Sequence, residues 1–273
     1  MHSTPVLHLD GAFLHTAFDS MIECGDKLGG IETIVEGVRG KSLLFQRIFS
    51  DDADMMTDTE FFDVCAFMPT VRRRIRLLLQ ARGFEFLRDT IKTLLNGITL
   101  ENADSRIQTL KAELALDAKD RWIQDLAAEI VHYRSPDEFP LMTRWVWDRE
   151  SNTGVLREVW FAEMKNNRLE ISDGVRTHLE LRRELHGFLE NAGIYANHNF
   201  IMDILFAWVY SQYIGSQGGS FLKTEFSQSG TPFDYALRML GLDAALTGNG
   251  LTHMVLADGS RHRLSELIDA STH

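Results

Sequence analysis

The chain has 273 residues, of which 44% are hydrophobic, so it can bury a full core in one large domain or two smaller ones. Its formal net charge of -11 disfavours nucleic acid and anionic membranes as partners, and binding to phosphates would need a local basic patch. Its two cysteines exclude a cysteine-rich zinc site and a disulfide framework. Together with the lack of a secretory signal pattern, this cysteine usage predicts a cytoplasmic protein.

The first half of the chain has the pattern of consecutive amphipathic helices. Apolar residues recur at helical spacing behind Asp10, and Gly25 closes the pattern, which predicts a first helix. A second apolar stripe continues past Gly40, where we expect a break. Thr57 and Glu60 have the spacing of a capping box, so we interpret the acidic stretch around them as the boundary of a helix.

Further helical stretches follow in the same half. Pro69 suits a first helical position, and Asn96-Gly97 is a typical helix end. The predicted stretches cover residues 71–81, 84–95, 102–116 and 117–132. Two prolines then interrupt the helices in the segment 133–140, which is the strongest candidate for a boundary. We therefore expect a helical region, 1–135, and a region with helices and β-hairpins, 136–273, with one continuous domain as the alternative.

The second half begins with a change of pattern. Residues 141–147 alternate with the period of a strand, and 155–161 either return as a second strand or begin a helix; the hairpin is favoured. Asp258-Gly259 predicts a second hairpin within residues 250–264. Between the hairpins, helices are expected at about 174–191, at 199–214, and at 233–240 behind the cap Thr231-Pro232. The expected fold class is mainly α, a multi-helix core with a small antiparallel β element, and α+β is the alternative.

Asp203 is the only residue that is charged at neutral pH in the most apolar helical segment, 199–214. A helix that is apolar on every side belongs in a core, and a carboxylate there must be paired, hydrogen-bonded or protonated. The segment is too short to span a bilayer, so no membrane span is predicted. His198 precedes Asp203 by little more than one turn, and the two could serve as a general base or as metal ligands. The alternative is that Asp203 accepts bonds from an arginine or from backbone amides and specifies the packing.

Glu129 and His132 match the Glu-x-x-His element of carboxylate-bridged di-iron helical bundles. Such proteins need the element twice, and it does not recur here. The apolar stripe of this helix points nearly opposite to His132, so we interpret the pair as a surface feature. Cys24 and Cys65 lie in apolar helical patterns and are expected to be buried rather than nucleophilic.

Two further groups could form docking surfaces. The run 72–76 concentrates positive charge in four arginines: Arg72, Arg73, Arg74 and Arg76. They could bind phosphates, RNA or an acidic partner, or form a solvated face that pairs with the acidic stretch 51–58. Trp145, Trp147 and Trp160 fall within one short segment and could form an aromatic recognition surface, or could pack the hairpin onto helices.

Two hypotheses about function follow from these patterns. The favoured one is a cytoplasmic accessory or regulatory protein that acts through protein contacts, with the tryptophans and arginines as candidate surfaces. The alternative is a helical enzyme whose catalytic residues are Asp203 and His198, in a buried site that could be metal-dependent. No common catalytic motif is present, which favours the first hypothesis. The sequence predicts a protein partner rather than nucleic acid, and it identifies no particular metal, cofactor or oligomeric state.

Overall fold

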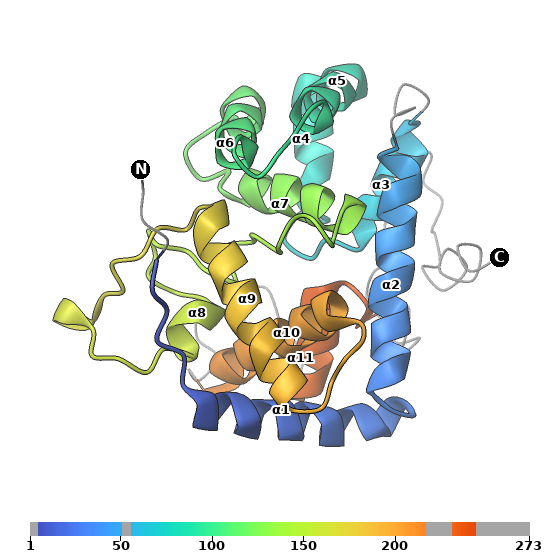
Figure 1. Cartoon of the computed structure of the whole chain (residues 1–273). Helices are drawn as coiled ribbons and strands as arrows, with labels where there is room; N and C mark the ends of the chain where they lie inside the picture. The colour runs from blue at the N-terminus through green and yellow to red at the C-terminus, as the bar shows by residue number, and fades with distance from the viewer. Residues whose placement is uncertain (1–4, 51–55, 217–230, 244–273) are drawn as a thin grey trace. The chain divides into compact units, whose positions relative to one another are not determined.

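The computed structural model describes residues 5–50, 56–216 and 231–243 (Figure 1). These residues form eleven α-helices and, apart from isolated bridges, no β-structure. The predicted mainly α fold class is therefore confirmed for this part of the chain. None of the helices described combines the length and apolar character that crossing a membrane requires.

The chain divides into two compact units. Of the described residues, unit 1 comprises those in the ranges 5–36 and 144–240, and unit 2 comprises those in the ranges 37–143 and 241–243. The sequence pattern suggested a boundary at residue 136, whereas the chain leaves unit 2 after residue 143. The N-terminal helix also belongs with the second half of the chain, a long-range association that a local sequence pattern does not reveal.

Unit 1 is built around one apolar helix. Its elements are α1 (Gly11–Gly25), η1 (Asp26–Leu28), α8 (Val155–Glu158), η3 (Lys165–Asn167), α9 (Val175–Asn191), α10 (His198–Ser216) and α11 (Pro232–Leu240), together with the start of α2 (Ile31–Ile48). Helices α1, α8, α9 and α11 all contact α10, and all five helices are labelled in Figure 1. The expectation that an all-apolar helix occupies a core is confirmed.

Unit 2 contains the rest of α2 and the remaining helices. These are α3 (Asp58–Ala66), α4 (Ile75–Arg82), α5 (Phe84–Leu95), α6 (Ala103–Leu114) and α7 (Trp122–Arg134). Helices α5 and α6 pack on α7, whose residues are buried on every face from Trp122 to Tyr133 apart from Gln124. Helix α7 is therefore the central helix of this unit.

Several predicted helix ends are confirmed by their capping bonds. Asp10 accepts a 2.9 Å bond from the Phe13 amide at the start of α1. Thr57 and Glu60 form the predicted capping box of α3. Such caps satisfy amides that the first turn of a helix leaves without intrahelical partners.

Three local predictions are wrong. Helix α2 continues through Gly40 without a break, because an apolar stripe that packs into a core outweighs the roughly 1 kcal/mol cost of one helical glycine. Helix α4 begins at Ile75, and residues 69–74 form turns. The hairpin around residues 141–161 is absent. Only one isolated bridge, between Asp148 and Thr153, joins two residues of this segment, and the short helix α8 follows it.

Burial explains why the predicted hairpin does not form. An alternating strand buries one set of side chains and exposes the other. In residues 141–148, every residue except Arg144 is buried, so the segment is covered on both sides. The amides of Val155 and Leu156 bond back to the Trp145 and Val146 carbonyls, which turns the chain into α8. The second predicted hairpin, at 250–264, lies outside the described residues.

Candidate functional site

Asp203 lies in the core of unit 1, as predicted from its apolar helix. The residue is 2% exposed, and it has a hydrogen-bonding or electrostatic interaction in the structure. A buried carboxylate with a partner fits both the catalytic and the packing interpretation, so burial by itself does not assign it a role.

His198 is brought together with two residues that the sequence analysis missed. His186 and Glu190 lie one helical turn apart near the end of α9, and His198 is the first residue of α10. One potential ligand atom from each of the three residues lies within 4.8 Å of the others. Asp203 is not a member of this group. The His-x-x-x-Glu spacing on α9, a short turn before His198, is the sequence signal that could have revealed the group.

Glu129 and His132 were expected at the surface, and this prediction is wrong: each residue is only 2% exposed. The prediction was made from the apolar stripe of the helix, which assumes that the helix has one buried face. Helix α7 is buried on all sides. The Lys41 Nζ atom lies 2.8 Å from Glu129 Oε2 and 4.0 Å from the centre of the Tyr133 ring. His132 Nδ1 lies 2.8 Å from the Phe139 carbonyl oxygen.

This Lys41–Glu129 pair sits in an unusual electrostatic environment. Burial raises the pKa of the Glu129 carboxyl, while the Lys41 ammonium opposes that shift and Asp125 adds to it. The Oε1 atom of Glu129 has no hydrogen-bond partner among the described residues. Burial, reinforced by the charge of Glu129, also raises the pKa of the Cys65 thiol well above its usual value. Cys65 is thus a buried thiol rather than a nucleophilic thiolate, as expected, whereas Cys24 is only partly buried.

Lys41 was not predicted as a site residue, although its position in the sequence carries a signal. On a helix, residues 38, 41 and 45 share one face, and Val38 and Phe45 are apolar. A lysine inside an apolar stripe needs a partner when the stripe is buried, and Glu129 supplies it. The pair therefore joins α2 to α7 within unit 2.

The four arginines of the basic run differ in their surroundings. Arg72 makes a bidentate pair with Asp243, with N–O distances of 3.2 and 3.3 Å, and both side chains are largely buried. The left-handed Gly241 (φ +77°) leads the chain into this pair, and a Cβ atom there would overlap the Phe67 carbonyl. The other three arginines, Arg73, Arg74 and Arg76, are exposed.

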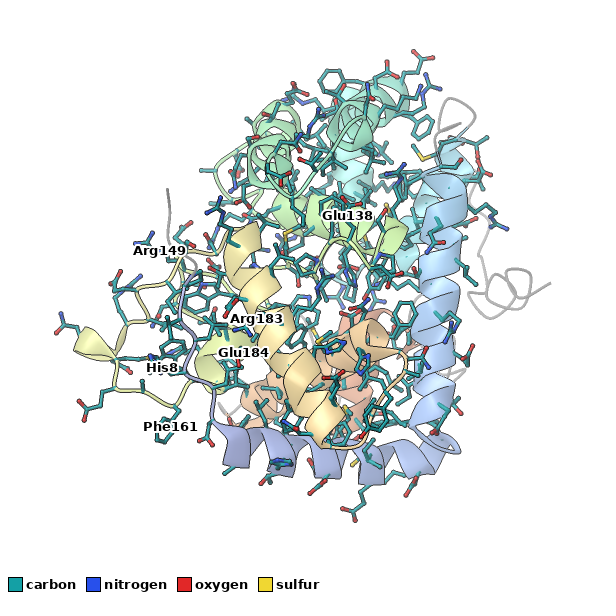
Figure 2. The ribbon with its side chains drawn as sticks, in the orientation of Figure 1. His8, Glu138, Arg149, Phe161, Arg183 and Glu184 are labelled. Carbon is teal, nitrogen blue, oxygen red and sulfur yellow. The ribbon has the colours of Figure 1, made fainter. Side chains whose placement is uncertain are left out.

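The tryptophans favour the core interpretation. Trp145 and Trp147 are 6% and 1% exposed, so neither presents a docking surface. The Trp147 indole donates a 3.3 Å bond to the Ile171 carbonyl. Trp160 is partly exposed and meets the His8 ring edge-on at 5.5 Å, where an isolated bridge joins Leu9 to Trp160. Figure 2 labels His8 and Phe161, whose backbones are joined by a 2.8 Å bond at this bridge.

Comparisons with protein-family models, with curated proteins and with solved structures find no match for this chain.

Proposed function

We propose that the chain is a cytoplasmic accessory protein that binds an acidic segment of a partner protein through the start of α4. We call this surface the arginine face, and it consists of Arg73, Arg76 and Leu77. The observation that carries the proposal is that two cations and a large apolar side chain are all left facing solvent there. Leu77 is 65% exposed, and neither arginine has an ion pair with any described residue.

The arginine face does not serve the stability of its own helix. Backbone dipoles place partial positive charge at a helix N-terminus, where a cation costs about 0.3–1 kcal/mol. The first turn of α4 has no acidic residue, and its N-cap residue, Arg74, makes no capping bond. Arginines at this position weaken the helix, so their presence is better explained by binding than by folding.

The chemistry of the face indicates the chemistry of its partner. Guanidinium groups bind carboxylates through paired hydrogen bonds, and an exposed leucine offers an apolar contact between them. A partner segment with acidic residues around an apolar side chain fits this arrangement. Nucleic acid is the weaker fit, because the chain carries a formal charge of -11 and the face offers only two arginines.

Site-specific photo-cross-linking tests the proposal. A photoreactive phenylalanine analogue at position 77, in cells that naturally make the protein, should attach to a partner segment rich in Asp and Glu. The double variant Arg73→Gln/Arg76→Gln should lose that adduct, because the two cations supply the electrostatic attraction.

Matched controls make the experiment specific. Arg47→Gln/Lys119→Gln removes the same charge from exposed positions of unit 2 and should keep the adduct. The same photoreactive residue at Leu116, which is 51% exposed, should give a different set of adducts or none. An adduct that persists in Arg73→Gln/Arg76→Gln, or that consists of nucleic acid, would contradict the proposal.

A further inference from the structure

The corner between α9 and α10 has an ordered backbone that carries three polar side chains. Leu185 and Leu189 anchor the end of α9 in the core, and Ile201 anchors the start of α10. The Ile194 amide closes the end of α9 with a 2.9 Å bond to the Leu189 carbonyl. Gly193 adopts a left-handed conformation (φ +85°) that permits this tight turn. The backbone at this corner is therefore ordered by apolar anchors and its own hydrogen bonds.

Three side chains converge at this corner. His186 Nδ1 lies 3.7 Å from Glu190 Oε1, and the rings of His186 and His198 face each other with centroids 4.0 Å apart and planes 34° apart. One potential ligand atom from each residue lies within 4.8 Å of the other two. Two imidazoles and a carboxylate form the donor set of many three-ligand zinc sites.

The hydrogen bond of His198 orients its ring for metal binding. His198 Nε2 lies 2.9 Å from the Ile194 carbonyl oxygen. A carbonyl oxygen can only accept, so Nε2 carries the proton, and Nδ1 of the neutral ring keeps its lone pair. Metal-binding histidines commonly donate their second ring N–H to a backbone carbonyl in this way.

We infer that His186, Glu190 and His198 bind one divalent transition-metal ion of the Zn²⁺ class. Imidazole nitrogen suits Zn²⁺, Cu²⁺ and Ni²⁺, whereas Ca²⁺ and Mg²⁺ require oxygen ligands, of which this group offers only one carboxylate. The inference is independent of the arginine face, because these three residues belong to unit 1 and the arginines to unit 2.

Only small side-chain movements separate this geometry from a coordinated one. Ligand atoms about 2.1 Å from a tetrahedral metal lie about 3.4 Å from one another. The His186–Glu190 distance of 3.7 Å is already close to that value. These two side chains are 45% and 51% exposed, so they can rotate toward His198 without disturbing the core.

Three protein ligands leave at least one coordination position for water or another ligand. Structural zinc sites normally use four protein ligands and are closed, whereas three-ligand sites keep an open position. The corner is also already anchored by apolar contacts, so folding does not require the ion. The geometry indicates an exchangeable ion at a corner whose backbone is already folded.

Calorimetric titration of the full chain with Zn²⁺, after removal of metal by a chelator and without an affinity tag, tests the inference. Wild type should bind one ion at this corner. Each of the variants His186→Gln, Glu190→Gln and His198→Gln should lower the affinity by a factor of at least about 10, because each removes a ligand. Circular dichroism should show unchanged helix content in all three variants.

Two control variants separate this site from adventitious binding by other histidines and acids. Glu184→Gln removes an acid from α9 that pairs with Arg183 at 2.6 Å; both residues are labelled in Figure 2. His15→Gln removes an exposed histidine of α1 that contacts Phe188. Both controls should bind Zn²⁺ as wild type does. No Zn²⁺ binding by wild type, or equal affinity in the double variant His186→Gln/His198→Gln, would overturn the inference.

Discussion

Two groups of cations in unit 2 have opposite surroundings. Lys41 and Arg72 are turned inward, each against a carboxylate, and they connect parts of the chain that are distant in sequence. Arg73 and Arg76 face solvent at the start of α4 without an ion pair to a described residue. Within this unit, the buried cations Lys41 and Arg72 contact carboxylates of the fold, whereas the side chains of Arg73 and Arg76 are exposed.

The adjacent residues Arg72 and Arg73 show this difference most clearly. The Arg72 side chain is 10% exposed and bonds Asp243 through two nitrogen atoms, whereas Arg73 is exposed. A count of arginines in the sequence treats the two alike. The different roles proposed for the two arginines follow from this difference in burial.

The largest expected effect comes from breaking the Lys41–Glu129 pair. Glu129→Leu leaves a buried ammonium without its anion and should lower the free energy of unfolding by about 3–5 kcal/mol. The double variant Lys41→Met/Glu129→Leu should recover much of that loss, because two apolar side chains of similar size need no partner. Urea denaturation of wild type and the two variants measures both effects. If the double variant is as unstable as Glu129→Leu, the loss of stability has a cause other than the unpaired Lys41 ammonium.

A smaller effect is expected from the inward arginine of the basic run. Arg72→Ala should lower the free energy of unfolding by about 1.5–3 kcal/mol, the usual range for a hydrogen bond to a charged group. Asp243→Ala should cost a similar amount, and the double variant should cost less than the sum, because one interaction is lost in all three. Strict additivity in this cycle would mean that Arg72 and Asp243 act separately.

The exposed arginines should show the smallest effect, with the opposite sign. Arg73→Gln/Arg76→Gln should leave the free energy of unfolding unchanged or raise it by up to about 1 kcal/mol per residue, because two cations are removed from a helix N-terminus. Pairing with the acidic stretch 51–58, the alternative suggested by the sequence, makes the opposite prediction. In that case the variant is less stable than wild type at low salt and equal to it at high salt.

Local signals in the sequence predicted where helices begin better than they predicted which residues contact those helices in the fold. Asp10 and Thr57 mark helix starts because a cap is a contact between residues three positions apart. The burial of Glu129 depends on α2, which is far away in sequence. The apolar stripe of its own helix, α7, therefore led to the wrong prediction that Glu129 lies at the surface. His198 was selected from the sequence, but its neighbours His186 and Glu190 depend on a turn that contains left-handed residues.

The binding constant between the full chain and the acidic segment identified by cross-linking tests the central claim most directly. If the arginine face binds this segment, wild type should bind more weakly as the salt concentration rises. The reason is that salt shortens the electrostatic screening length, which is about 8 Å at physiological ionic strength. The arginine face also predicts that Arg73→Gln/Arg76→Gln binds weakly with a smaller salt dependence, while Arg47→Gln/Lys119→Gln matches wild type. Equal dissociation constants for wild type and Arg73→Gln/Arg76→Gln at low salt would contradict the claim.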